Sequence, residues 1–407
     1  MPRLVALTVV STVIALASAA CQTYDLEPVN PLAIRTVHVQ RLVIAKKAKP
    51  ELMLMVDRSG SMLKPIDPAN ANCPAGCGTL ANQCPASCPT RWSDLKGAMN
   101  DFLTTYGNVA RMGLTPFTGP YDPATRSVCN PGIVQVDTST SNDVPSELQA
   151  QAATINTQIG SLSPNYGTPT GPTLKNLASY APLQNPDRDD YILLLTDGLP
   201  NCNPDNAHEY TSNPVDQAAC KCTETSASAC SAPGYTRILC LDQDYSVQQI
   251  AALQAQGVKT VVVGFGAETA AGDGPAALTA MGAAGGYKLT CPRGLDSECA
   301  GGTCNLGDQT CSNTFYQAGD RAALSEALSR LAREIDPFPC QYDLPLIPSD
   351  DKFISVVVDG VAVPRGPDTW TFVPPQEIDL QGSLCTRAEN TNTLSPMSLQ
   401  IGVIQTF

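Results

Sequence analysis

Three oxygen-bearing side chains stand at alternate positions just after an apolar run. They are Asp57, Ser59 and Ser61, and Gly60 lies between the two serines. On a turn that leaves a strand, such side chains converge on one point, and a glycine lets the backbone approach it closely. Carboxylate and hydroxyl oxygens are hard ligands that suit Mg²⁺, Ca²⁺ or Mn²⁺ better than zinc. The segment therefore predicts a divalent-metal site.

Two more polar segments follow along the chain. Gly167-Thr-Pro-Thr-Gly171 opens a helical pattern, and Leu195-Thr-Asp-Gly198 ends a second apolar run. Taken singly, each segment is equally well interpreted as a turn or a helix cap, because Asp, Ser, Thr and Gly favour both roles. All three in this order, each at a strand end or a helix start, favour one shared metal site.

Strand and helix patterns alternate around these segments. Continuous apolar runs indicate strands that are covered on both faces of a parallel sheet; they are Glu51–Asp57, Tyr191–Thr196 and Lys259–Gly264. Helical patterns cover Trp92–Tyr106, Ser146–Leu162, Thr173–Tyr180, Ser246–Ala255, Pro275–Gly282 and Asp320–Ile335. We predict an α/β, Rossmann-like fold with a central, mostly parallel sheet and helices on both faces, whose carboxyl edge binds the ligand.

Together the three polar segments resemble the metal-ion-dependent adhesion site of the von Willebrand factor A family, and the resemblance covers about residues 51–335. The metal ligands that it implies are Asp57, Ser59 and Ser61 in the first loop, Thr168 in the second and Asp197 in the third. Thr170 is an alternative to Thr168, because the Thr-Pro-Thr repeat permits either alignment. The resemblance also implies a von Willebrand factor A-type domain whose metal takes a carboxylate from a partner protein.

The N-terminus has the features of an export signal. Arg3 and the apolar run from Leu4 to Ala20 predict a secretory signal peptide over residues 1–20. Ser18-Ala-Ala-Cys21 resembles the lipobox of bacterial lipoproteins, although Ser18 stands where leucine is usual, and cleavage by the ordinary signal peptidase is the alternative. Gln22 implies, by the same resemblance, sorting to the outer membrane. We expect an exported, lipid-anchored protein with no membrane-spanning helix in its mature part.

The 17 cysteines support this location, because lipidation of Cys21 leaves an even number that can pair in an oxidising compartment. Most of them gather in three predicted insertions, residues 63–90, 199–245 and 288–312. Zinc is an alternative for Cys73-x3-Cys77 and Cys84-x3-Cys88, but an exported chain favours disulfides. The connectivity does not follow from the sequence.

The predicted domain organisation has four parts. They are the signal over residues 1–20, a lipidated tether and N-terminal strand over 21–50, the von Willebrand factor A-type domain over 51–337, and a β-rich C-terminal module over 338–407. Within this module, Asp359-Gly360 predicts a hairpin between Phe353–Val358 and Val361–Val363. We also hypothesise that the strand Ile34–Ile44 joins the C-terminal module.

Other chemistry has little support. The net charge of −13 argues against nucleic-acid binding. His38 and His208 are the only histidines, and neither has a nucleophile nearby in the sequence. The sequence contains no GxxxxGK[ST] phosphate loop and no HExxH motif. We therefore predict no catalytic residues, no organic cofactor and no enzymatic activity.

Two functions agree with an exported metal-binding domain. The first is a surface adhesin, anchored by its lipid, that binds an extracellular protein or glycan through an acidic group. The overall layout is similar to that of myxobacterial cell-surface lipoproteins, which include adhesins of adventurous gliding motility, and this resemblance implies a role in gliding or surface adhesion. The second is a periplasmic or outer-membrane scaffold that uses the same site to hold a protein partner.

Overall fold

The computed structural model describes residues 34–44, 49–120, 129–138, 143–186, 188–211, 213–224, 227–291, 293–299, 302–335, 340–389 and 397–406. The predicted signal and Cys21 lie outside these residues. The chain divides into two compact units. The α/β unit comprises the described residues between 44 and 342 together with 385–389, and the β unit comprises those of 34–43, 343–384 and 397–406.

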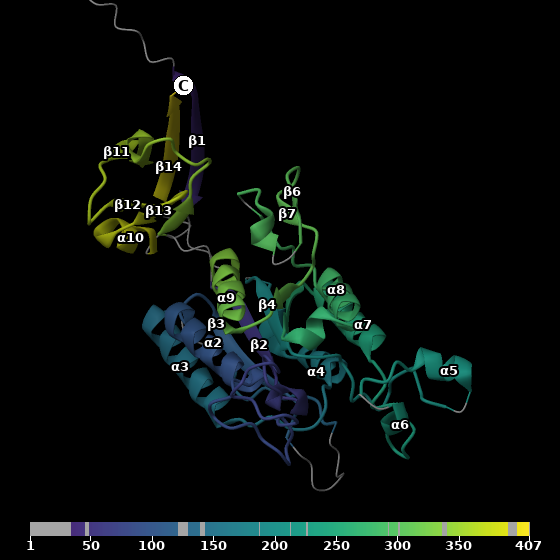
Figure 1. Cartoon of the computed structure of the whole chain (residues 1–407). Coiled ribbons are helices and arrows are strands. Elements are labelled where there is room, and N and C mark those ends of the chain that lie inside the picture. The colour runs from purple at the N-terminus through teal and green to yellow at the C-terminus, as the bar shows by residue number, and fades with distance from the viewer. Residues whose placement is uncertain are drawn as a thin grey trace, which may run out of the picture. The chain divides into compact units, whose positions relative to one another are not determined.

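The core of the α/β unit is a five-stranded sheet in the order β3-β2-β4-β5-β8, and every neighbouring pair is parallel (Figure 1). Its strands are β2 (Glu51–Asp57), β3 (Arg111–Phe117), β4 (Asp190–Thr196), β5 (Val258–Phe265) and β8 (Tyr316–Ala318). Every residue of β2 and β4 is buried, as their continuous apolar runs predict. The predicted fold class is confirmed.

Six helices cover the two faces of this sheet. One face packs against α2 (Arg91–Tyr106), α3 (Pro145–Ser161) and α9 (Arg321–Ile335), and the other against α4 (Thr170–Leu177), α7 (Gln243–Ala255) and α8 (Gly274–Ala284). Side chains of β2 alternate between the faces, with Leu52 and Leu54 in the first core and Met53 and Met55 in the second. Period-two alternation of the apolar residues within β2 thus supplies both cores.

Disulfides tie the insertions together. The sixteen cysteines other than Cys21 form eight bonds, which are Cys73–Cys88, Cys77–Cys84, Cys129–Cys202, Cys220–Cys240, Cys222–Cys230, Cys291–Cys304, Cys299–Cys311 and Cys340–Cys385. The two cysteine clusters close enough together to hold a metal belong to these bonds, so they offer no thiolate to zinc. Regular structure in the insertions is short: α5 (Pro214–Ala219), α6 (Ala227–Cys230), η4 (Asp296–Cys299), β6 (Cys304–Asn305) and β7 (Thr310–Cys311). The 3₁₀ turn η1 (Gly60–Leu63) begins before the first insertion.

The β unit contains a four-stranded sheet in the order β1-β14-β10-β11. A three-stranded sheet has the order β12-β13-β9, and of β9 only Asp343 belongs to this unit. The bounds are β1 (Ile34–Ile44), β9 (Gln341–Asp343), β10 (Ile354–Val358), β11 (Val361–Val363), β12 (Trp370–Val373), β13 (Glu377–Leu380) and β14 (Met397–Thr406). The hairpin at Asp359-Gly360 is confirmed, and both residues have positive φ. Pairing of β1 with β14 agrees with the hypothesis for the N-terminal strand.

The other helical elements are short. An eight-residue helix, α10 (Gly382–Glu389), lies in the C-terminal segment, where the sequence predicted strands alone. In the part of the chain that the structure describes, no helix combines the length and the apolar character needed to cross a bilayer. Short 3₁₀ turns occur at η2 (Ala181–Gln184), η3 (Ala267–Ala270) and η5 (Asp351–Phe353).

Candidate metal centre

The first polar segment begins where β2 ends, at the carboxyl edge of the sheet. Asp57 is fully buried there, and both of its carboxylate oxygens accept hydrogen bonds. The backbone N–H of Ser59 donates to Oδ1 at 2.7 Å, and the hydroxyl of Thr196, the last residue of β4, donates to Oδ2 at 2.7 Å. Because β2 and β4 are parallel neighbours, the loops after them begin side by side. Asp57 is thus fixed by both loops.

The serine hydroxyls connect this loop to the third segment. Ser59 Oγ lies 2.8 Å from Ser61 Oγ, and Ser61 donates a hydrogen bond of 2.8 Å to Asp197 Oδ1. Gly60, between the serines, donates its N–H to the Tyr166 carbonyl at 2.8 Å, and a Cβ on it would stand 3.3 Å from that oxygen. The structure therefore brings together Ser59, Ser61 and Asp197, from loops 136 residues apart.

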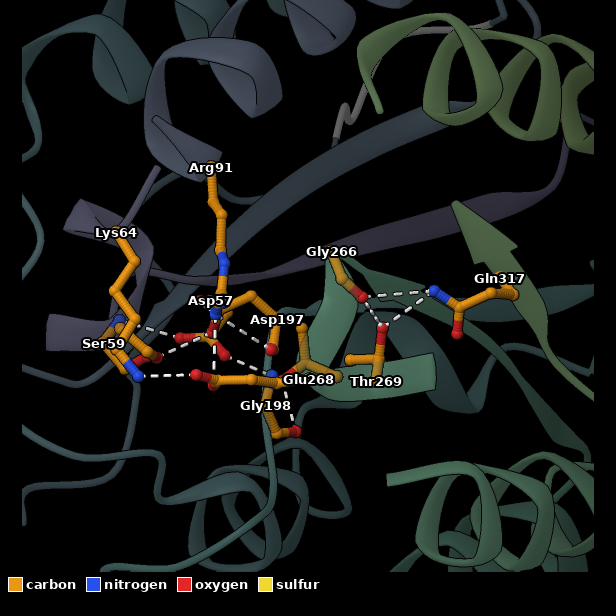
Figure 2. A network of polar contacts seen from close by, with 12 residues as sticks. Asp57, Ser59, Lys64, Arg91, Asp197, Gly198, Gly266, Glu268, Thr269 and Gln317 are labelled. Carbon is orange, nitrogen blue, oxygen red and sulfur yellow. Dashed lines mark hydrogen bonds and ion pairs between the residues drawn. The ribbon is translucent and has the colours of Figure 1, made fainter. Parts of the chain in front are cut away.

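The buried side chain of Arg91, which the sequence did not predict at this site, lies beside these residues (Figure 2). Nη1 of Arg91, at the start of α2, donates to Asp197 Oδ2 at 2.8 Å and lies 3.1 Å from Glu268 Oε2. The Arg91 side chain is 5% exposed, and that of Asp197 is fully buried. The other Glu268 oxygen accepts from Lys64 Nζ at 2.5 Å. Asp197 thus belongs to a network of four charged residues, together with Arg91, Glu268 and Lys64.

Burial sets the protonation of the two aspartates. Burial and, second to it, the charge of the neighbouring Asp197 raise the pKa of Asp57 to about 7, although hydrogen bonds from Ser59 and Thr196 act in the opposite direction. Burial also raises the pKa of Asp197, while Arg91 and Ser61 act in the opposite direction. Two buried carboxylates that repel one another are stabilised as anions by a nearby cation. A divalent ion would supply that charge, so the environment fits a metal as well as the donor atoms do.

The second polar segment lies beside these loops. Thr168 is 5% exposed, and its backbone N–H donates to Asn201 Oδ1 at 2.8 Å. Thr170 is the first residue of α4 and is also buried. Among the described residues, the hydrogen bonds of the structure do not link either threonine hydroxyl to the cluster of Asp57, Ser59, Ser61 and Asp197. The choice between Thr168 and Thr170 stays open.

The remaining candidates belong to other segments of the chain. His208 belongs to a cysteine-rich insertion, where its Nε2 lies 3.3 Å from a carboxylate oxygen of Asp244. His38 lies in β1, in the β unit. The lipidation site Cys21 is outside the described residues. The chemistry that the cluster itself can offer is a set of carboxylate and hydroxyl oxygens in a buried, charged environment, which is the donor chemistry of hard divalent cations.

The residues missed by sequence analysis share one property, namely that each is defined by a distant partner. Thr196 adjoins a predicted ligand, yet its bond to Asp57 spans 139 residues. Arg91 follows the helix cap Thr90, which gives no sign that its partner lies 106 residues away. Gly266 directly follows β5, and only the structure shows that its φ is 89° and that a Cβ there would lie 3.2 Å from Arg91 Nε.

Comparison with known proteins yields matches at the level of structure. No protein-family model and no curated protein matches the sequence. The pilus adhesin SpaC from Lactobacillus rhamnosus GG, in an open conformation, is similar with 13% identity and a TM-score of 0.42 over 90% of this chain and 41% of that chain. The vWF domain of the type V pili tip protein Mfa5 from Porphyromonas gingivalis has 13% identity and a TM-score of 0.40, over 72% and 96% of the two chains.

A third similar structure is the manganese-loaded TRAP protein from Plasmodium vivax, with 12% identity and a TM-score of 0.28 over 57% of this chain and 61% of that chain. The chain thus spans less than half the length of the SpaC structure. These are likenesses of fold, and the function of the site has to follow from its own residues.

Proposed function

We propose that Asp57, Ser59, Ser61 and Asp197 bind one divalent cation, Mg²⁺, Ca²⁺ or Mn²⁺, and that the protein is an adhesin that presents this cation to an extracellular ligand. The observation that carries the proposal is the chain of contacts from Ser59 through Ser61 to Asp197, with a distance of 2.8 Å at each step. It brings hydroxyl and carboxylate oxygens from two loops to one edge of the sheet.

The proposed ligands are of two kinds, charged and neutral. Asp57 and Asp197 would supply the negative charge that holds the ion, and Ser59 and Ser61 would add neutral oxygen donors. Thr168 is proposed as a further donor from the second loop. Five protein ligands leave a divalent ion short of a six-oxygen shell, so a carboxylate of the extracellular protein or an acidic group of a glycan can complete it. Such an ion provides the electrostatic attraction for an acidic ligand.

The disulfides support export of the chain. Eight of them are expected in a secreted or surface protein and are rare in a reducing cytosol. Cys21, which takes no part in these bonds, is proposed as the lipid anchor to the outer membrane. A surface location would place the metal centre where an extracellular partner or a substratum can reach it, in surface adhesion or gliding motility.

Metal binding is tested with the purified full chain by calorimetric titration of Mn²⁺ after treatment with EDTA. Asp57→Asn removes one proposed ligand charge and is expected to abolish binding. Asp101→Asn is the matched control, because Asp101 lies on α2 with a half-exposed side chain paired to Arg321. Equal Mn²⁺ affinity in wild type and Asp57→Asn would remove the metal site from the mechanism.

Location and role are tested on intact cells. An antibody or protease that does not enter cells should reach a surface adhesin and should miss a periplasmic scaffold. Cells that carry Asp57→Asn at normal protein level should adhere or glide less than cells that carry Asp101→Asn. Protection of the wild-type protein in intact cells would favour the scaffold that holds a partner inside the envelope.

A further inference from the structure

A fourth loop contacts the proposed metal centre. It follows β5, the neighbour of β4 in the sheet, and contains the 3₁₀ turn η3. Glu268 in this turn belongs to none of the three polar segments that predicted the metal site. Its carboxylate is nevertheless separated from that of Asp197 by a single side chain, because both carboxylates contact the same nitrogen of Arg91 (Figure 2).

The contacts of Glu268 are directed at two cations. Oε2 lies 3.1 Å from Arg91 Nη1, which also donates to Asp197 Oδ2 at 2.8 Å. Oε1 accepts from Lys64 Nζ at 2.5 Å. The backbone of Lys64 is bonded on both sides, because its N–H donates to the Ser61 carbonyl at 2.9 Å and its carbonyl accepts from Arg91 N at 3.0 Å. Glu268 thus joins the serine loop, the start of α2 and the third loop.

The fourth loop is built to hold this arrangement. Gly266 adopts φ of 89°, and a Cβ on it would come within 3.2 Å of Arg91 Nε, so glycine leaves room for the guanidinium. Thr269 donates its hydroxyl to the Gly266 carbonyl at 2.7 Å. Gln317, in β8, donates to that hydroxyl at 3.0 Å. The position of Glu268 is therefore defined by packing and hydrogen bonds on both sides of it.

The charged side chains around Asp197 determine how strongly a cation would be attracted to it. Arg91 is buried and places a full positive charge against Oδ2 of Asp197. This charge opposes the binding of a divalent ion to the same carboxylate. Glu268 offsets the Arg91 charge, and Lys64 in turn offsets part of Glu268. The three side chains adjust the net charge next to the proposed ligands without supplying a ligand themselves.

We propose that Glu268 sets the metal affinity of the centre by neutralising Arg91, and that Lys64 lowers this affinity by pairing with Glu268. Glu268 is a positioning residue in this scheme. The inference rests on the proposed function, since it presupposes a cation at Asp57, Ser59, Ser61 and Asp197. It adds a fourth loop to a site that the sequence motif assigns to three loops. It also adds the ion pairs that Glu268 forms with Arg91 and Lys64.

The test compares the dissociation constants for Mn²⁺ of full-length variants. Glu268→Gln keeps the shape and removes the charge, and we expect it to weaken binding about five- to tenfold, because it leaves the Arg91 charge beside Asp197 without compensation at an intermediate dielectric. Lys64→Gln should strengthen binding about two- to threefold, a smaller effect, because Lys64 acts on the centre only through its ion pair with Glu268. Both side chains are about two-fifths exposed, 41% for Lys64 and 44% for Glu268, so the variants should fold.

Two controls separate a local charge effect from a general one. Glu209→Gln removes the same charge from an exposed ion pair with Arg237 in an insertion and should leave the affinity unchanged. Glu268→Asp keeps the charge and should recover most of the affinity lost in Glu268→Gln. The difference between wild type and Glu268→Gln should also shrink in about 1 M salt, where the screening length falls to ~3 Å, whereas a purely structural role would be insensitive to salt.

Each outcome decides something. An unchanged dissociation constant in Glu268→Gln, or an equal loss in Glu209→Gln, would overturn the role of Glu268 while leaving the metal site intact. Failure of the wild-type chain itself to bind Mn²⁺, with Asp57→Asn indistinguishable from it, would overturn the proposed function and this inference together. A loss in Glu268→Gln that salt does not alter would show that the residue acts through structure and would also overturn the charge mechanism.

Discussion

Asn201 is hydrogen-bonded to Thr168 through both its backbone and its side chain. The N–H of Asn201 donates to the Thr168 carbonyl at 2.9 Å, and Asn201 Oδ1 accepts from the Thr168 N–H at 2.8 Å. The side-chain amide of Asn201 also donates to Thr223 Oγ1 at 2.9 Å. Asn201 and Thr223 belong to a cysteine-rich insertion, so this insertion positions the second loop of the candidate site.

Removal of the Asn201 side chain should therefore loosen the second loop. In Asn201→Ala the buried N–H of Thr168 loses its acceptor, and an unsatisfied buried donor costs about 1–3 kcal/mol of unfolding free energy. If Thr168 is a metal ligand, the dissociation constant for Mn²⁺ should rise as well. Urea denaturation and Mn²⁺ titration measure the two effects.

Asn156→Ala is the matched control, because Asn156 lies on α3 and its side chain makes an exposed hydrogen bond to Asn100. It should change neither the unfolding free energy by more than about 0.5 kcal/mol nor the metal affinity. Loss of stability in Asn201→Ala with unchanged Mn²⁺ affinity would confine Asn201 to a structural role and would argue against Thr168 as a ligand.

Arg91 should act as an internal substitute for metal charge. Arg91→Met leaves Asp197 buried without its cation, which destabilises the metal-free protein by about 3–5 kcal/mol. A divalent ion would then supply the missing charge, so Mn²⁺ should raise the melting temperature of Arg91→Met by more than it raises that of the wild type. Thermal melts with EDTA and with Mn²⁺ provide the comparison.

The double variant Arg91→Met/Asp197→Asn tests the cause. Neutralising Asp197 removes the uncompensated charge, so most of the lost stability should return in EDTA. The response to Mn²⁺ should at the same time disappear, because a proposed ligand is gone. A double variant that remains as unstable as Arg91→Met would show that packing of the guanidinium, rather than its charge, accounts for the loss.

The opposite edge of the sheet should make stability depend on pH. Burial and, second to it, the charge of neighbouring Glu51 raise the pKa of Asp190 to about 7. Asp190 is 6% exposed, and its Oδ1 has no hydrogen-bond partner among the described residues. A folded-state pKa above the unfolded value, about 3.9, means that the protonated form favours folding. This contribution is complete below about pH 4 and is lost as the pH rises through about 7.

Asp190→Asn imitates the protonated form and should flatten this dependence. We expect it to be more stable than the wild type at pH 8 by more than about 1 kcal/mol and to differ little at pH 4. Urea denaturation at a series of pH values measures the effect. Asp205→Asn, at an exposed aspartate, is the control and should leave the curve unchanged. A wild-type curve that rises from pH 5 to pH 8 relative to Asp190→Asn would contradict the assignment.

The sequence predicted the elements whose burial is uniform. The runs at β2 and β4 contain no polar alternation because helices cover both faces, and this environment can be deduced from apolar residues alone. The sequence did not predict β3, since Gly113 and Pro116 are unfavourable in strands. The structure accommodates them because β3 is an edge strand of its sheet, where proline is tolerated. Glycine at position 113 leaves room for Met53, whose methyl group would lie only 2.8 Å from a Cβ there.

Local patterns also marked the polar loops, and the structure adds what local patterns cannot contain. Asp57 and Asp197 follow apolar strands, so their common edge could be deduced from the parallel topology. The charge balance at that edge depends on Arg91 and Glu268, which contact one another across 177 residues. No spacing rule connects such residues, and only the tertiary fold shows that the guanidinium lies between two carboxylates.

The last prediction concerns the disulfide Cys129–Cys202, which joins the chain after β3 to the residue following Asn201. A Cβ on Gly167 would stand 2.6 Å from Cys202 Sγ and 2.9 Å from Asn201 Oδ1, so the bond packs directly against the second loop. Replacing both cysteines by serine should cost about 2–4 kcal/mol and should increase hydrogen exchange in residues 165–170. Replacing Cys291 and Cys304, a bond that closes a short loop within another insertion, should leave exchange in that segment unchanged. Equal protection of residues 165–170 in all three proteins would show that Asn201 alone holds the second loop, and the Mn²⁺ affinity of the Cys129→Ser/Cys202→Ser variant would then match that of the wild type.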